Sequence, residues 1–380
     1  GSVSSFTILL IVFFLFKEAG GLFNTPATEE GYVLAVNKSN DVGKLSPEKI
    51  MDIFDGNITN WKDISGMDQD ILIFRFSDLT NYYTEEELGD EFQYVPQKIS
   101  ELVAKEPGII AFFPKQYLLE KGFQGKVLPE EKITLGEFFG GTKWYPTSTP
   151  APIFGLIPLL LGTLLVSIGA IVLSLPFGIA VAIYMAEIAN KRTRDLVKPI
   201  IELLAGIPSV VYGFFGLVVI VPLIQKTFDL PVGETAFAGS VVLAIMALPT
   251  IITIAEDAMR TTPRAMKEAS LALGATQWQT IYKVIIPYSI SGITSAVVLG
   301  IGRAIGETMA VLMVTGNAAV IPTSFFEPVR TIPATIAAEL GEAPAGGAHY
   351  EALFLLGAVL FLITLILSIS VEYISSKRKI

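Results

Sequence analysis

Cysteine is absent from this 380-residue sequence, and histidine occurs once, at position 349. Without cysteine the chain cannot form disulfides, thiolate nucleophiles, iron–sulfur clusters or cysteine-ligated zinc sites. A lone histidine in a loop rich in Gly, Ala and Pro is a poor basis for metal or acid–base chemistry. No nucleophile–base pair is visible either, so we expect neither an enzyme nor a cofactor bound by this chain.

Two further absences concern nucleotides and nucleic acids. The sequence has no Gly-x-x-x-x-Gly-Lys-Ser/Thr phosphate-binding loop, so it is not expected to hydrolyse ATP. Its formal net charge is −9, and no basic surface pattern points to nucleic acid as a partner. The excess acidity is confined to residues 28–132, which carry 20 acidic and 11 basic side chains. A polar block of this size in an apolar chain indicates a separate soluble domain.

Long apolar stretches dominate what is present. Hydrophobic residues make up 52% of the chain and the mean hydropathy is +0.58, which indicates a polytopic membrane protein. We expect the end of a first transmembrane helix, whose beginning is missing, within residues 1–27. The other apolar stretches that approach or exceed the ~20 residues needed to span a bilayer lie at 153–188, 203–224, 238–255, 289–314 and 352–374. The sequence therefore predicts six transmembrane helices.

Lys and Arg gather in three polar segments, 190–198, 260–283 and 377–379. With alternating spans, all three fall on one side of the membrane. Because basic loops stay in the cytoplasm, both termini are predicted to be cytoplasmic and residues 28–132 extracytoplasmic.

The outer block 28–132 has the pattern of an α/β domain. Short apolar runs at 32–36, 71–76 and 109–113 predict buried strands. Between the first two runs, Ser46 can cap a helix that continues with Pro47 and ends near Gly56.

The fifth apolar stretch contains two charges, Arg303 and Glu307. Four residues apart in a helix, they would share one face, where each can partly neutralise the other. An arginine inside the membrane costs about 2.5–3.5 kcal/mol on insertion scales, so it normally faces a protein interior or a water-filled path. One interpretation is a self-satisfied pair that fixes helix packing. We favour an anion pathway, since a guanidinium offers a planar fork of donors for a tetrahedral oxyanion.

The polar segment 256–291 predicts two short helices separated near Gly274. Within it, EASLALG at 268–274 followed by VIIP at 284–287 resembles the EAA motif of ABC importer permeases. The resemblance implies a cytoplasmic coupling loop that docks on a separate ATPase subunit. The matching positions are Glu268, Ala269, Ser270, Gly274 and Pro287, with Ser270 in place of the family's second alanine.

Three further motifs resemble the PstC and PstA permeases of phosphate importers. They are LLAGIPSVVYG at 203–213, RAIGETMAV at 303–311 and GN at 316–317. The resemblance covers residues 133–380 and implies the type I ABC importer permease fold with a phosphate pathway. The pathway candidates are Arg303, Glu307, Thr308, Asn317 and Ser209.

Residues 28–132 are an addition to this family pattern. The segments 45–61 and 106–112 resemble one lobe of the phosphate-binding protein that serves these importers. Such proteins hold phosphate between two lobes, partly on backbone N–H groups in a Ser/Gly/Thr-rich turn. Here the corresponding turn, 75–80, has no glycine, and the second lobe is missing. We therefore expect the insert to dock the separate binding protein or to cover the outer mouth of the pathway; a remnant without a transport role is the alternative.

The resemblance as a whole implies an all-α polytopic membrane protein in a prokaryotic plasma membrane, with an α/β insert at 28–132 and a permease core at 133–380. Its implied partners are a PstA-type permease, a PstB-type ATPase dimer that uses ATP and Mg, a PstS-type binding protein, phosphate and membrane lipids. Two alternatives stay open: a permease for sulfate, molybdate or tungstate, and a membrane phosphate sensor that no longer transports. The EAA pattern and the arginine favour transport, since a sensor needs neither.

Overall fold

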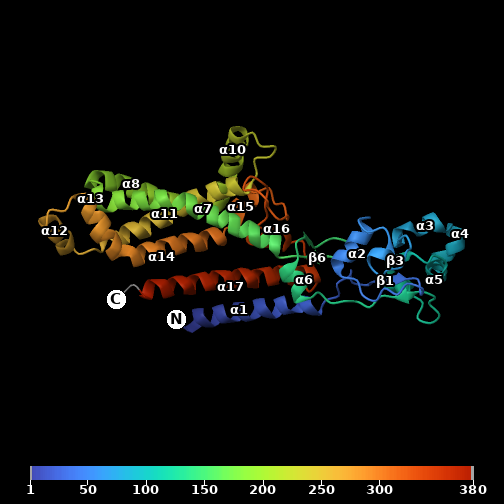
Figure 1. The fold of residues 1–380 in the computed structure, drawn as a ribbon. Helices are drawn as coiled ribbons and strands as arrows, with labels where there is room; N and C mark the ends of the chain where they lie inside the picture. The colour runs from blue at the N-terminus through green and yellow to red at the C-terminus, as the bar shows by residue number, and fades with distance from the viewer. Residues whose placement is uncertain (1, 378–380) are drawn as a thin grey trace. The chain divides into compact units, whose positions relative to one another are not determined.

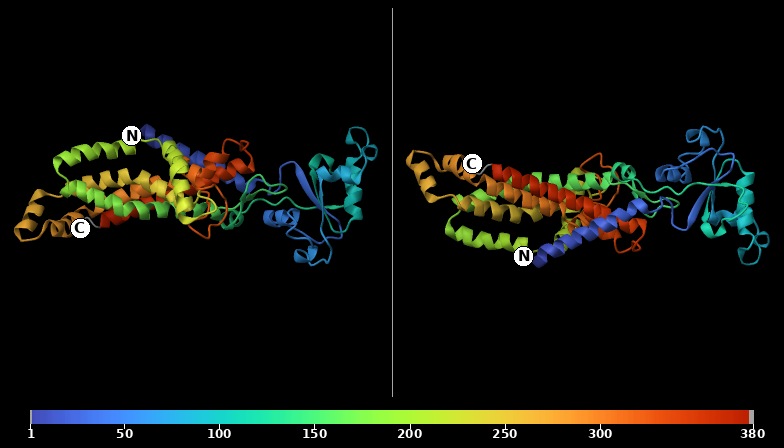
Figure 2. Two further views of the ribbon diagram at one scale, coloured as in Figure 1. Left: turned by 90° about the horizontal axis from the view of Figure 1, so that it is seen from above. Right: turned by 90° about the horizontal axis from the view of Figure 1, so that it is seen from below.

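The computed structural model describes residues 2–377, which fold into two compact units. One unit comprises Leu156–Ala343, with the N-terminal helix up to Ala19 and the C-terminal helix from Leu353. The other comprises Gly20–Gly155 and Pro344–Ala352. We call them the helical unit and the α/β unit. Figure 1 labels their elements, and Figure 2 shows the ribbon from two further sides.

Six helices of the described residues are long and apolar enough to cross a membrane, which confirms the predicted number. These spans are Ser5–Asn24, Ile157–Ile188, Ser209–Phe228, Ala236–Arg260, Gln277–Ile305 and Ala348–Ser370. The third span begins later than the predicted 203–224, because a preceding helix ends at Ala205 and the next begins at Ser209. The helices that form these spans and the connections between them are α1 (Ser2–Gly21), α7 (Ile157–Ile183), η6 (Tyr184–Ile188), α8 (Lys191–Ala205), α9 (Ser209–Phe215), η7 (Gly216–Ile220), α10 (Val221–Phe228), α11 (Ala236–Arg260), α12 (Arg264–Ala272), α13 (Gln277–Thr280), η8 (Ile281–Ile285), α14 (Ile286–Ile305), α15 (Met309–Val314), α16 (Ile332–Glu339) and α17 (Ala348–Lys377).

Helix α11 is the centre of the helical unit. Of the most apolar stretch of this span, 61% is buried inside the protein, against 28% for the span formed by α7 and η6. Helix α11 contacts both α7 and α14. Figure 1 shows these three helices running side by side. Small residues permit the close packing, as is usual between membrane helices. A Cβ at Gly178 of α7 would lie 2.8 Å from Ile251 of α11, and one at Gly300 of α14 would lie 3.0 Å from the same side chain.

The α/β unit is built on a four-stranded sheet in the order β2-β3-β1-β4. Strand β1 pairs antiparallel with β3 and β4, whereas β2 pairs parallel with β3. The predicted strand at 32–36 is confirmed, and the other two predicted strands match within one residue. The elements are η1 (Leu22–Asn24), β1 (Tyr32–Val36), α2 (Pro47–Phe54), η2 (Trp61–Asp63), β2 (Leu72–Arg75), η3 (Phe76–Asp78), α3 (Leu79–Tyr82), α4 (Glu85–Leu88), η4 (Asp90–Phe92), α5 (Val95–Lys105), β3 (Ile109–Pro114), η5 (Lys115–Tyr117), β4 (Lys126–Val127), α6 (Leu135–Gly140), β5 (Trp144–Tyr145) and β6 (Ile153–Phe154).

Alternation along β1 fills both faces of this sheet. Val33 and Ala35 belong to one buried cluster with residues of α5, and Leu34 and Val36 belong to another with residues of α2. A strand with a side-chain period of two and helices on both sides has this pattern. The predicted cap of α2 is confirmed, since Ser46 Oγ accepts from a backbone N–H of the first turn at 3.5 Å.

The two ends of the predicted insert meet each other. The N–H of Ala27 donates to the carbonyl of Glu131 at 2.6 Å, and Pro26 forms an antiparallel bridge with Lys132. The α/β unit extends beyond these bounds to include residues 133–155. This shifts the predicted division at 133, because α6 and β5 bury aromatic side chains such as those of Phe138 and Trp144 within the α/β unit.

Candidate functional site

Arg303 lies near the end of the fifth span, and Glu307 and Thr308 follow it in a break between two helices. Helix α14 ends with Gly306 as its C-cap, and α15 begins after Thr308. The predicted arrangement of Arg303 and Glu307 on one continuous helix face is therefore wrong. The cause is local: Glu307 Oε1 accepts from the N–H of Ala310 at 3.2 Å, so this carboxylate satisfies a free donor at the start of α15.

Arg303 is half-buried and donates from Nη1 to the hydroxyl of Thr250 at 3.2 Å. Thr250 lies on α11 directly after Pro249, inside the most buried span. A hydroxyl orients the guanidinium without neutralising it, and across residues 2–377 the structure records no carboxylate ion-paired with Arg303. The sequence analysis missed Thr250. The available signal was a Pro-Thr pair in the middle of an apolar helix, where a polar group needs a partner.

Asn317 lies just beyond α15 in a turn held by several hydrogen bonds. Its φ is +51°, and that of Gly316 is +76°. Its Nδ2 donates to the carbonyl of Leu312 at 2.6 Å, and its own carbonyl accepts from Arg330 Nε at 2.9 Å. The side-chain oxygen is buried without a partner in the described residues. The turn therefore holds one buried acceptor that water or a donor group of a ligand would satisfy.

Ser209 begins α9, which packs against α15. A Cβ at Gly213 would lie 2.8 Å from the Met313 sulfur and 2.9 Å from the Cα of Ala310, so glycine allows the two helices to touch. The five predicted pathway residues thus lie in α14, in the break before α15, in the turn after α15 and at the start of α9. Glu307 and Thr308 precede α15, Asn317 follows its C-terminal end, and Arg303 lies in the last turn of α14.

Helices α12 and α13 form an exposed pair on either side of Gly274, whose φ of +84° confirms the predicted separation at this residue. No residue of α12 is buried, and Glu268 and Ala269 are both exposed. Ser270 is half-buried, with its hydroxyl 3.0 Å from that of Thr280. This contact ties α12 to α13.

Apolar side chains on the same segment face outward. The exposed fraction is 90% for Leu273, 73% for Tyr282 and 65% for Trp278. Pro287, in the first turn of α14, is also exposed where the segment joins the fifth span. Exposed apolar patches with polar surroundings mark protein–protein or membrane interaction sites.

The turn after β2 in the α/β unit uses its donors internally. Asp78 Oδ2 accepts from the N–H of Arg75 at 3.1 Å. Arg75 Nη2 donates to the carbonyl of Phe54 at 2.8 Å, and its guanidinium lies 5.2 Å from the centre of the Phe54 ring. A carboxylate of the chain thus occupies a backbone donor that a bound anion would need.

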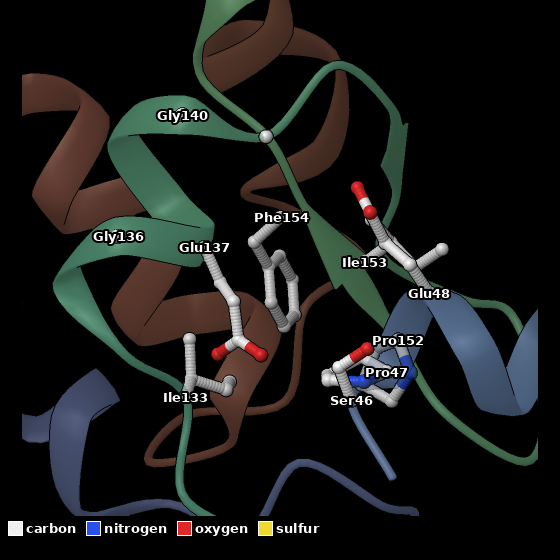
Figure 3. A pocket seen from close by; sticks show the side chains of 11 residues that line it. Ser46, Pro47, Glu48, Ile133, Gly136, Glu137, Gly140, Pro152, Ile153 and Phe154 are labelled. Carbon is white, nitrogen blue, oxygen red and sulfur yellow. The ribbon is translucent and has the colours of Figure 1, made fainter. Parts of the chain in front are cut away.

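A cavity of about 250 Å³ lies within the α/β unit, between the start of α2, α6 and β6 (Figure 3). Glu48 and Glu137 line it, and no Lys or Arg does. Glu137 accepts from the N–H and the hydroxyl of Thr134, both at 2.9 Å, so its carboxylate completes the cap of α6. The acidic lining disfavours an anion in this cavity.

Residues 174–380 match a protein family described as the binding-protein-dependent transport system inner membrane component. The chain belongs to this family. A second match covers residues 13–159, to the PBP superfamily domain. The chain therefore combines an inner-membrane transport component with a segment that is similar to the PBP superfamily domain.

Several curated proteins of this kind are similar to the chain. The probable ABC transporter permease protein YqgH of Bacillus subtilis is 42% identical over 64% of this chain and 79% of its own length. The phosphate transport system permease protein PstC of Pasteurella multocida is 38% identical over 61% and 78% of the two chains, and that of Mesorhizobium japonicum 40% over 61% and 76%. A solved MetNI methionine ABC transporter in an inward-facing conformation is 19% identical, with a TM-score of 0.48 over 59% of this chain and 96% of that one.

Proposed function

We propose that this chain is the PstC-type permease subunit of an ATP-driven importer of inorganic phosphate. The relatives named PstC are matched over about three quarters of their length, 76–78% for the two described above. The observation that carries the proposal is Arg303, a half-buried cation oriented by a neutral hydroxyl at 3.2 Å. Because no carboxylate in the described residues pairs with it, its charge is available to an anion.

Arg303 is proposed to make the main contact with phosphate in the pathway. A guanidinium has five N–H donors, and Thr250 accepts from one nitrogen, so the others can bind two oxygens of a tetrahedral anion. Glu307, close by in the break, would weaken that attraction enough for the anion to leave, as conduction requires. Thr308, Asn317 and Ser209 are proposed to supply further polar groups along the path.

The exposed pair α12–α13 is proposed to dock on a separate ATPase dimer that hydrolyses ATP with Mg. Its outward apolar side chains, Leu273, Trp278 and Tyr282, give the area that such an interface buries. A PstA-type permease would complete the pathway. This arrangement requires α12–α13 and both termini to be cytoplasmic, in a prokaryotic plasma membrane.

The α/β unit is proposed to receive the PstS-type binding protein on the outer side of the membrane, rather than to hold phosphate. Its likeness to the PBP superfamily supports an origin in such a protein. Its turn after β2 is filled by the Asp78 carboxylate, which argues against tight anion binding there.

The decisive experiment is reconstitution of the complete four-component importer in proteoliposomes with measurement of ATP-dependent uptake of labelled phosphate. Sulfate, molybdate and tungstate serve as competitors. Phosphate uptake that a large excess of these anions leaves unchanged supports the proposal. Inhibition by one of them at low concentration assigns the chain to that oxyanion. A fully assembled complex without uptake of any oxyanion points to a sensor.

A further inference from the structure

Glu187 contacts both helices of the exposed pair α12 and α13, which we call the coupling helices. It lies in η6, the π-helical last turn of the span that α7 begins. Its Oε1 is 2.6 Å from Lys267 Nζ of α12, and its carbonyl accepts from Gln277 Nε2 of α13 at 3.1 Å. The ion pair is largely shielded, with exposed side-chain fractions of 12% for Glu187 and 23% for Lys267. Partial burial reduces the screening that makes exposed pairs weak.

This ion pair attaches α12 laterally to another part of the helical unit. None of its residues is buried, so apolar packing does not hold it. Within residues 2–377, its side chains are recorded in polar contacts with Glu187 and with Thr280. Thr280 belongs to α13, the other half of the same exposed pair. The bond to Glu187 is therefore the one that joins α12 to a different membrane span.

The span that carries Glu187 leads to Arg303 through direct contacts. Ser240 of α11 donates to the carbonyl of Val166 of α7 at 3.1 Å, and Gly178 allows α7 to lie against Ile251. The residue before Ile251 is Thr250, whose hydroxyl holds Arg303. Contacts between α7 and α11, and between α11 and Arg303, thus connect the span that carries Glu187 to the proposed phosphate contact.

We propose that the Glu187–Lys267 ion pair transmits the movement of the coupling helices to α7, and through α7 and α11 to Arg303. This rests on the proposed function, because it assigns a role in coupling transport to ATP hydrolysis. Glu187 is a positioning residue: it touches neither nucleotide nor phosphate. The π-helical turn suits this role, since such turns occur often at functional sites.

The test uses the complete importer in proteoliposomes with three variants: Glu187→Gln, Lys267→Met and the two combined. The measured quantity is oxyanion taken up per ATP hydrolysed, alongside the amount of ATPase that copurifies. We expect each single variant to lower this ratio about 10-fold, a usual size for a coupling free energy, with copurification unchanged. The combined variant should lose no more than either single one, because all three remove the same interaction.

The matched control is Asp257→Asn. Asp257 also forms an ion pair, at 3.3 Å with Lys198, but it is 62% exposed, and within residues 2–377 no polar contact to α12 or α13 is recorded for its side chain. Its ratio should equal that of the wild type. An unchanged ratio in the single variants, additive losses in the combined variant, or losses that match reduced copurification would each overturn the inference. Absence of wild-type uptake would instead count against the proposed function, so the two failures are distinguishable.

Discussion

At the residue scale, the partner of Arg303 distinguishes two roles for an arginine inside a membrane. Paired with a carboxylate, it would be a neutral packing element whose removal affects mainly assembly. Bonded to Thr250, it keeps its charge and has donors to spare. The two roles give opposite results when the charge is removed.

Arg303→Ala is expected to abolish phosphate uptake while the importer still assembles. Arg303→Lys should restore little, because an ammonium lacks the planar fork that binds two oxygens at once. Uptake by reconstituted importer and copurification of all subunits are the measurements. Normal uptake by Arg303→Ala would remove this residue from the pathway.

Thr250→Val is expected to raise the KM for transport about 5- to 10-fold, the size expected for losing one hydrogen bond of ~1–1.5 kcal/mol. The variant keeps the shape of the side chain but leaves Arg303 without its orienting acceptor. Thr250→Ser retains the hydroxyl and should behave like the wild type. Equal KM values for the valine and serine variants would show that the hydroxyl does not matter.

Glu327 gives a prediction for pH. The hydroxyl and the N–H of Thr323, both at 2.7 Å, together with the N–H of Ser324, hold the pKa of its carboxyl below the ordinary 4.5. Because the folded-state pKa is lowered, the stabilisation is present above the unfolded value and is lost as pH falls through the folded value. The Tm of the wild type should exceed that of Glu327→Gln at neutral pH, and this gap should close on acidification below about 4.5. A gap that is independent of pH would contradict the assignment.

At the scale of elements, the break between α14 and α15 shows where sequence reasoning succeeds and where it fails. The six spans, the strand at 32–36 and the separation at Gly274 were predictable, because each depends on a local pattern of apolar residues, caps and glycine. The helical spacing of Arg303 and Glu307 failed, since it assumes that no residue between them ends the helix. Gly306 does so, and Glu307 then caps the next helix.

Contacts between residues far apart in the sequence could not be predicted from it, for a different reason. Thr250 and Arg303 are 53 positions apart, and Glu187 and Lys267 are 80 apart. No local propensity links such pairs. The contact of α14 with α11 brings the first pair within bonding distance, and the contact of η6 with α12 brings the second, so both pairs are visible only in the three-dimensional structure.

Gly274→Ala is expected to destabilise the α12–α13 turn by about 1 kcal/mol, because its φ of +84° is left-handed and costs an L-residue that much. Open space surrounds the position, so no clash adds to the cost. The readouts are copurification of the ATPase and uptake per ATP. Gly341→Ala is the control, since that glycine is equally open but has no left-handed φ. If both variants behave alike, the conformation of Gly274 is unimportant for coupling.

At the scale of the whole molecule, charge and hydropathy differ between two parts of the chain. The excess acidity lies in residues 28–132, whereas the six apolar spans all lie outside this segment. Each unit has its own buried clusters, as independent cores require. We therefore expect the units to be separable in function.

Excision of residues 28–130, with a short Gly-Ser connection, is expected to leave the helical unit folded and the importer assembled. Because Ala27 and Glu131 are hydrogen-bonded to each other, a short connection can join the two ends that the excision leaves. Delivery should weaken: the concentration of binding protein for half-maximal uptake should rise, while the maximal uptake rate stays near that of the wild type. An unchanged concentration dependence would show that residues 28–130 have no part in delivery.

The hydrogen-bonded ends of the insert also bear on how such a chain arises and how it can be re-engineered. The N–H of Ala27 donates to the carbonyl of Glu131, so residues 28–130 leave and rejoin the rest of the chain at one point. A segment inserted at this point lengthens one loop, between the spans Ser5–Asn24 and Ile157–Ile188, and leaves the sequence of every membrane helix unchanged. The same insertion point should accept a foreign domain whose termini are adjacent, such as a circularly permuted fluorescent protein, which would turn the transporter into an optical reporter.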